Sequence, residues 1–181
     1  MARNVEIKAR LRDSDGIRSR LDALRASAPQ HLSQTDTFFN VPAGRLKLRD
    51  FGDGTGELIV YERADTAGPK LSSYHRAPIA APSELLDVLT RALGTRGVVR
   101  KQRAVYLVGQ TRVHLDEVEG LGVFVELEVV LREDQTVADG DAVARDLLQQ
   151  LCIDAKDLVT HAYIDLLTGA SASRSHPPPQ R

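Results

Sequence analysis

Cysteine is nearly absent from this chain, because Cys152 is the only one among 181 residues. A framework of disulfides is therefore excluded, and we expect a reduced, cytoplasmic location. Long apolar runs are absent too. None of signal-peptide length follows Met1 and none could span a bilayer, so we expect no membrane partner. Cys152 itself lies in an apolar helical context, which predicts a core position.

Net charge is also nearly absent, since 24 Lys and Arg residues against 25 Asp and Glu residues leave −1 at pH 7. That balance gives no indication of a nucleic-acid partner. Internal repeats and a linker between two domains are missing, and the length suits one compact domain with a substantial core. We predict a single domain over residues 1–170 and a disordered tail over 171–181, which is rich in Ser and Pro.

The glycine-rich segment Gly52–Gly56 lacks the features of a phosphate-binding loop. Such a loop has a Lys and a Ser or Thr after its glycines and then a helix. The residues that follow, Glu57–Arg63, have the pattern of a strand instead. A hairpin turn between two strands therefore fits the segment better.

What the sequence does contain is strict alternation, most clearly in Gly122–Leu131 (GVFVELEVVL). Phe124, Glu126 and Glu128 fall on one face of that strand, and Leu127 falls with the valines on the other. Similar patterns predict seven further strands. They are Arg3–Leu11, Thr35–Asn40, Arg45–Phe51, Glu57–Arg63, Leu71–Ala77, Val98–Val108 and Thr111–Val118.

Apolar residues at helical spacing predict four helices. They cover Ser14 to Leu24, Pro82 to Leu93, and roughly Gly140–Leu151 and Lys156–Leu167. Most connections between strands are short, which favours antiparallel pairing, and eight strands are enough to close a barrel with room inside. We predict an α+β fold in which an eight-stranded antiparallel β-barrel has its helices packed on the outside.

Charges on the alternating strands are sorted by sign, because acids occupy the first strand and the last two while bases dominate the middle ones. The acids are Glu6, Asp116, Glu126 and Glu128. The bases are Lys8, Arg10, Arg45, Lys47, Arg49, Arg63, Lys101, Arg103 and Arg112. These faces therefore carry a surplus of five positive charges in a chain whose total is −1.

Two interpretations of these faces compete. One antiparallel strand with alternating charge most often has a solvated face. Several such strands, dense in titratable groups and segregated by sign, favour a charged interior with the apolar faces outside under helices. Buried cations then need a polyanionic ligand, and the clustered carboxylates need a hard divalent cation such as Mg²⁺ or Mn²⁺. A polyphosphate with bound metal meets both demands.

Four short motifs, in this order, resemble the CYTH family, the triphosphate tunnel metalloenzymes, over roughly residues 3–168. The motifs are Glu6-Ile-Lys8, Arg45-Leu-Lys-Leu-Arg49, Lys101-Gln-Arg103, and His114-Leu-Asp116 through Phe124-Val-Glu126-Leu-Glu128. The resemblance implies an eight-stranded antiparallel tunnel and a metal-dependent enzyme. The family includes class IV adenylate cyclases, thiamine triphosphatases and inorganic triphosphatases.

The resemblance also implies roles for individual residues. The implied metal-binding acids are Glu6, Asp116, Glu126 and Glu128. The implied triphosphate-binding bases are Lys8, Lys47, Arg49, Arg63, Lys101 and Arg103, to which we add Arg45 and Arg112 on physical grounds. We take Glu6, Lys8 and Asp116 as candidate catalytic residues. One departure is Asn4, which stands where the family usually has the first Glu of Glu-x-Glu-x-Lys and puts a second metal ion in doubt.

The expected reaction is that of a class IV-type adenylate cyclase, which converts ATP to cyclic AMP and pyrophosphate. The alternative is a hydrolase of inorganic triphosphate, thiamine triphosphate or a nucleoside triphosphate. A polyphosphate-binding module without turnover is a third hypothesis, which Asn4 favours. Tyr61, Tyr74 and His75 are candidates to contact the group beyond the phosphates, and we interpret His114 as a polar wall residue. The oligomeric state stays open, a homodimer included.

Overall fold

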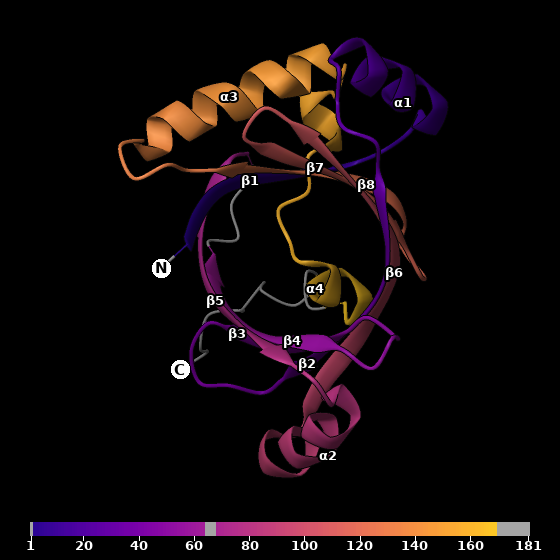
Figure 1. The fold of residues 1–181 in the computed structure, drawn as a ribbon, viewed down its shortest axis with the longest axis vertical. Coiled ribbons are helices and arrows are strands. Elements are labelled where there is room, and N and C mark those ends of the chain that lie inside the picture. The colour runs from indigo at the N-terminus through magenta and orange to yellow at the C-terminus, as the bar shows by residue number, and fades with distance from the viewer. Residues whose placement is uncertain (1, 64–67, 170–181) are drawn as a thin grey trace, which may run out of the picture.

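The computed structural model of the chain describes residues 2–63 and 68–169. Eight strands form one closed barrel in the order β1-β5-β4-β3-β2-β6-β7-β8, and every neighbouring pair is antiparallel (Figure 1). The predicted eight-stranded antiparallel barrel is therefore confirmed. Its strands are β1 (Ala2–Arg10), β2 (Gln30–Phe39), β3 (Arg45–Asp50), β4 (Gly56–Arg63), β5 (Lys70–Ile79), β6 (Thr95–Val108), β7 (Thr111–Val118) and β8 (Gly122–Val130).

The helices are α1 (Ser14–Ala23), α2 (Pro82–Leu93), α3 (Val137–Gln150), the short 3₁₀ helix η1 (Ala155–Asp157) and α4 (Tyr163–Leu167). Figure 1 shows α1 and α3 over the part of the wall formed by β1, β7 and β8, with α2 at the opposite side. None of the helices in the described ranges is long and apolar enough to cross a membrane. The tail predicted over 171–181 lies outside the described residues.

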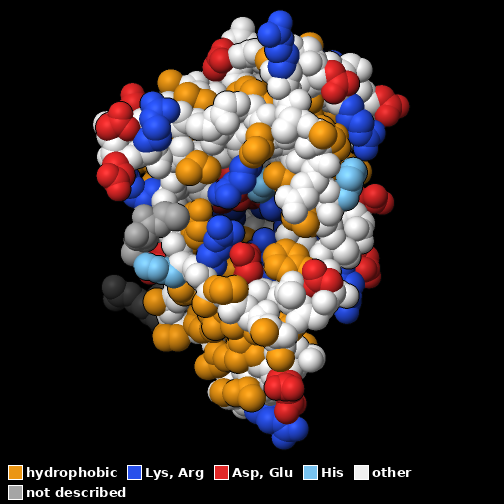
Figure 2. All heavy atoms as spheres, in the orientation of Figure 1, with side chains coloured by type: hydrophobic (Ala, Val, Ile, Leu, Met, Phe, Trp, Pro, Cys, Tyr) orange, Lys and Arg blue, Asp and Glu red, His pale blue; other side chains and the backbone are white. Residues whose placement is uncertain are grey.

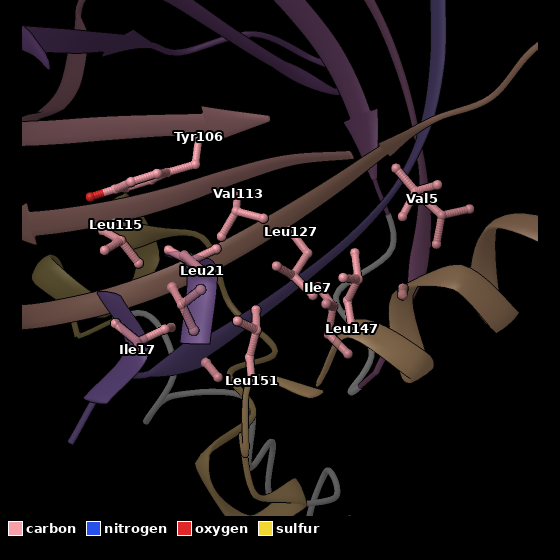
Figure 3. Packing of buried hydrophobic residues seen from close by; sticks show 14 residues of the cluster. Val5, Ile7, Ile17, Leu21, Tyr106, Val113, Leu115, Leu127, Leu147 and Leu151 are labelled. Atoms are coloured by element: carbon pink, nitrogen blue, oxygen red, sulfur yellow. The ribbon is translucent and has the colours of Figure 1, made fainter. Parts of the chain in front are cut away.

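The main apolar core lies between the outer face of the barrel and the helices α1 and α3. Val5 and Ile7 of β1 and Leu127 of β8 meet Leu21 of α1 and Leu147 of α3 there (Figure 3). Because the apolar positions of these strands face outwards, the alternate, charged positions must face inwards. Amphipathic helices on the outside are thus what allows the barrel to keep a polar interior.

The prediction of one helix over Lys156–Leu167 is wrong for all but its last five residues, which form α4. The chain forms η1, then runs extended through Ala162, and only then begins α4. The backbone N–H of Val159 donates to the carbonyl of Lys8 at 2.8 Å, so this segment pairs with β1 instead of coiling. In Figure 1, α4 lies across one end of the barrel instead of against its side wall.

Two smaller expectations also fail. Cys152 is exposed, because it follows the end of α3 with a φ of 54° and its side chain leaves the apolar face of that helix. Strand β2 begins at Gln30, five residues before the predicted start at Thr35. The missed residues are mostly polar on both faces, so the alternation of apolar and polar positions gave no sign of them.

Gly140 tests how closely α3 approaches the barrel. A Cβ at this position would lie 2.7 Å from both Val5 Cγ2 and Leu131 Cδ2. Gly to Ala normally stabilises a helix by about 1 kcal/mol. We expect Gly140→Ala to lower the free energy of unfolding by about 1–3 kcal/mol instead, because of overpacking. Urea denaturation measures this, and Ala142→Gly at an exposed position of the same helix should cost only about 1 kcal/mol. A more stable Gly140→Ala variant would contradict this packing.

Candidate functional site

The barrel encloses a cavity of about 310 Å³ that is lined by inward residues of all eight strands and by Ala162 and Tyr163. Figure 2 shows a hollow at the centre of the molecule, with basic and acidic side chains inside it. Glu6, Lys8, Lys101, Arg103 and Glu126 are each at most 8% exposed. The charged faces of the alternating strands therefore point inwards.

Strand pairing sets the height of each inward side chain along the barrel. The strands are strongly tilted, so residues at one height are displaced by two positions between neighbouring strands. Inward residues at one height form a ring. The ring at the end of the barrel farthest from Tyr163, called the mouth ring, holds Leu32, Phe51, Glu57, Arg76, Val105 and Arg112. The second ring holds Asn4, Gln34, Arg49, Tyr74, Arg103, His114 and Glu128. The third ring holds Glu6, Asp36, Lys47, Tyr61, Lys101, Asp116 and Glu126, and Lys8, Phe38, Arg63 and Phe124 lie deepest.

Tyr163 of α4 closes the deep end of the barrel. Its hydroxyl donates to Asp116 at 3.0 Å, and the Lys8 ammonium lies 3.8 Å from the centre of its ring. Phe124 packs edge-on against the same ring at 5.0 Å. Asp165 anchors the helix by accepting from Arg45 at 3.0 Å and from Arg96. The cavity therefore has its opening at the mouth ring.

Arg45 is thereby placed apart from the other predicted bases. It pairs with Asp165 beside a second, smaller hollow and does not line the main cavity. Tyr61 and Tyr74 do line the cavity, whereas His75 is exposed and does not. Arg10 is exposed and does not line the cavity either. The other predicted bases line it together with Glu6, Glu126 and Glu128, and Asp116 is buried beside Arg103.

Asp36 is a site residue that the sequence reasoning missed. It accepts from Lys47 at 2.7 Å and from Arg49 at 2.7 and 2.8 Å. Burial alone would raise the pKa of Asp36, but Lys47 and Arg49 hold it well below its usual range. Asp36 lies inside the predicted strand Thr35–Asn40, and its alternation with Gln34 and Phe38 is the signal that could have placed it on the inward face.

Asp116 plays the same part for the bases of β6. Arg103 donates to both of its oxygens, at 2.6 and 2.5 Å, and the Lys101 ammonium lies 3.6 Å away. Burial would raise the pKa of Asp116, but Arg103 and Lys101 bring it below its usual range. Asp116 is therefore an anion that holds two cations in place for a ligand.

The acids of β1 and β8 have different surroundings. Glu6 accepts from Arg63 at 2.5 Å, yet burial and repulsion from Glu126 raise the pKa of the Glu6 carboxyl. Burial would also raise the pKa of Glu126, but Lys8, His114 and Arg103 hold it well below its usual range. Glu126 is thus an anion at neutral pH, while Glu6 is more easily protonated.

Glu126, Glu128 and His114 form the donor set that best fits a metal ion. One ligand atom from each lies within 4.8 Å of the other two. His114 Nδ1 lies 3.8 Å from Glu126 Oε2, beyond hydrogen-bond reach, and is buried without a hydrogen-bond partner among the described residues. Asn4 Oδ1 is another buried acceptor in the same cavity with no such partner. Two carboxylates beside an imidazole nitrogen without a hydrogen-bond partner suit a divalent cation, although Glu126 also accepts from Arg103 at 2.8 Å and Glu128 is paired with Arg112 at 3.0 Å.

Lys101 yields a test of this buried charge. Burial, with repulsion from Arg103, lowers its pKa to about 7 from the usual 10.5. The unfolded chain therefore binds this proton between about pH 7 and 10 and the folded protein does not, so the free energy of unfolding should rise with pH across that window. We expect Lys101→Met to lower the slope of the free energy of unfolding against pH by up to about 1.4 kcal/mol per pH unit.

Urea denaturation at several pH values between 7 and 9.5 measures these slopes. Lys156→Met, at an exposed position, is the matched control and should keep the wild-type slope. Parallel curves for wild type and Lys101→Met would show that Lys101 is charged throughout in the folded protein.

Comparisons with known proteins identify a family whose members share this fold. Residues 2–163 match the family model of the CYTH domain. Adenylate cyclase CyaB of Aeromonas hydrophila is 28% identical over 170 residues, which cover 88% of this chain and 85% of that protein. The solved structure of the PH1012 protein from Pyrococcus horikoshii OT3 superposes with a TM-score of 0.81 at 22% identity, covering 90% of this chain and 98% of that one. The Hippeastrum protein HpAC1, with a described dominant triphosphatase activity, has a TM-score of 0.63 at 19% identity, covering 93% and 96%. This chain belongs to the CYTH family.

Proposed function

We propose that this protein is a divalent-metal-dependent enzyme that acts on a triphosphate in the barrel, and that its reaction is the conversion of ATP to cyclic AMP and pyrophosphate. The observation that carries the proposal is the division of the enclosed cavity into an acidic wall and a basic wall. The donor set of His114, Glu126 and Glu128 faces Lys47 and Arg49 of β3 across that cavity, and Arg103 of β6 connects the two walls by donating to Glu126 at 2.8 Å. A metal-bound triphosphate satisfies both walls at once.

The order of groups along the barrel supports reaction at the α-phosphorus. Lys8 and Lys101 lie next to Tyr163 at the closed end, which suits the terminal phosphates. His114 and Glu128 lie in the second ring, nearer the mouth. A triphosphate that enters terminal phosphate first has its α-phosphate on the mouth side, beside this donor set. The relative named as an adenylate cyclase agrees with this assignment.

In the proposed reaction, the 3′-hydroxyl oxygen of ATP bonds to the α-phosphorus and the bond from that phosphorus to the bridging oxygen breaks. A cation bound at His114, Glu126 and Glu128 would offset charge on the phosphoryl oxygens. Lys8 and Lys101 neutralise the departing pyrophosphate. Asp116 orients Arg103 towards the phosphates, and the hydroxyl proton leaves to water at the mouth, because Glu6 lies in the third ring beside the terminal phosphates and is paired with Arg63.

Glu126 and Glu128 are stronger candidates for metal ligands than Glu6 and Asp116, because they and His114 have ligand atoms within 4.8 Å of one another. Ion pairing does not separate the acids, since Glu6 pairs with Arg63, Asp116 and Glu126 pair with Arg103, and Glu128 pairs with Arg112. Each would join a metal only after its ion pair opens. The imidazole in the donor set favours Mn²⁺ over Mg²⁺, because Mg²⁺ prefers oxygen ligands.

Triphosphate hydrolysis is the second candidate, and the triphosphatase activity described for HpAC1 is what favours it. Asn4 Oδ1 faces the cavity with no hydrogen-bond partner in the described ranges and can accept a hydrogen bond from a water there, but the uncharged amide does not deprotonate that water. Hydrolysis would release orthophosphate and no cyclic nucleotide.

Product analysis with ATP and Mn²⁺ separates these candidates. We expect cyclic AMP and pyrophosphate in equal amounts, and we expect Glu126→Gln or Glu128→Gln to lower the rate by about 100-fold or more, because charge stabilisation is lost. Glu117→Gln, at an exposed position of β7, is the control and should keep the wild-type rate. Circular dichroism shows that each variant is folded.

Other product patterns have distinct meanings. Orthophosphate without cyclic AMP would replace the cyclase by the hydrolase. No turnover with any divalent metal, together with retained tripolyphosphate binding, would make the protein a binding module.

A further inference from the structure

The mouth ring of the barrel is divided into an apolar half and a charged half. Leu32, Phe51 and Val105 line the cavity from the adjacent strands β2, β3 and β6, with Phe51 directly after the end of β3. In the pairing of β2 with β6, Gln30 lies opposite Val105 and Leu32 opposite Arg103. Each of the three apolar side chains is only half-buried, so all three present surface to the cavity.

The charged half lies across the mouth on β4, β5, β7 and β8. Arg112 Nε lies 3.0 Å from Glu128 Oε2, and Arg76 Nη1 lies 3.3 Å from Glu57 Oε1. The bases of this half therefore already have acidic partners. The apolar half has no charge of its own at the mouth.

Packing of the fold does not explain the apolar half. Leu32, Phe51 and Val105 belong to neither of the two apolar cores, which are built from the outer faces of the strands and from the closed end. Apolar side chains left facing a charged, hydrated cavity favour a ligand that covers them. A phosphate chain is charged on all sides and would lose hydration against this surface without gaining a partner.

Next to the apolar half, Gln34 has a buried hydrogen-bond acceptor that a ligand would have to satisfy. Its side chain is 3% exposed and lines the cavity, and its Oε1 has no hydrogen-bond partner in the part of the chain that the structure describes. A buried acceptor of this kind selects a ligand with an N–H or O–H to donate. The ligand at the mouth thus has an apolar face and a donor at its edge.

We infer that Leu32, Phe51, Val105 and Gln34 form the subsite for the organic group of a nucleoside triphosphate, and that they make the barrel select such esters over inorganic triphosphate. The base lies against the apolar half, and an amino or hydroxyl group of the nucleoside donates to Gln34. The inference rests on the proposed function, since it places the phosphate chain in the barrel with its terminal phosphate near Tyr163.

Calorimetry with two probes tests the subsite. Tripolyphosphate reports the phosphate site alone, and α,β-methylene ATP reports both sites without being cleaved between its α- and β-phosphates. We expect Phe51→Ala to weaken the ATP analogue about tenfold, which is the scale of one aromatic stacking contact, and to leave tripolyphosphate within twofold. Gln34→Leu should show the same split, and its different chemistry keeps the test valid if Phe51→Ala fails to fold.

Val60→Ala is the matched control, because Val60 is an exposed apolar residue of β4 that lies between the inward-facing Ile59 and Tyr61 and therefore points to the outer face of the barrel. It should change neither affinity. Unchanged binding of the analogue by Phe51→Ala and Gln34→Leu, or an equal loss for both probes, would overturn the subsite while the proposed function stands. Wild-type protein that binds neither probe would remove the proposed function and the subsite together.

Discussion

Buried charge inside a closed barrel is the constraint on which the rest of this structure depends. Charges removed from water are costly unless they are paired and hydrogen-bonded. Asp36 and Asp116 meet this demand on the basic side, since each holds two cations of neighbouring strands. The same pairing holds Lys47, Arg49, Lys101 and Arg103 in fixed positions, which would spare the proposed anionic ligand the cost of ordering them.

The helices and the charged interior are two sides of one arrangement. Because α1 and α3 cover the outer face of β1, β7 and β8, the apolar positions of these strands are buried outside the barrel and their charged positions inside it. A one-residue slip of any strand would exchange the two faces. The third helix on the wall, α2, contacts β2 and β3 on the opposite side, so the barrel is supported from both sides.

Most of this architecture follows from alternation, which was visible in the sequence for β1, β3 and β8. The number of strands, the inward face and the grouping of Glu126 and Glu128 were predicted because the period of two is fixed by the backbone. The start of β2 escaped prediction because Gln30–Gln34 are mostly polar on both faces. Gln34 was missed for the same reason, whereas Asp36 lay inside the predicted strand Thr35–Asn40 and was not assigned to the inward face.

The closed end of the barrel could not be predicted, because only tertiary contacts define it. The sequence around Tyr163 has helical spacing, but Asp165 pairs with Arg45 and Arg96, and Tyr163 reaches Asp116. These contacts join residues far apart in the chain. Likewise, the sequence did not indicate that His114 is a candidate metal ligand, because this follows only from its position beside Glu126 and Glu128 in the folded barrel.

The central claim is that the acidic and basic walls bind different parts of one ligand, and thermal unfolding tests it directly. Tripolyphosphate at about 100 times its dissociation constant should stabilise the protein by about 2.7 kcal/mol, and Mn²⁺ should add a further increase in melting temperature. In a Glu126→Gln/Glu128→Gln double variant the increase from tripolyphosphate should remain and the increase from Mn²⁺ should disappear. No stabilisation of the wild-type protein by either ligand, or an unchanged Mn²⁺ effect in the double variant, would contradict the account.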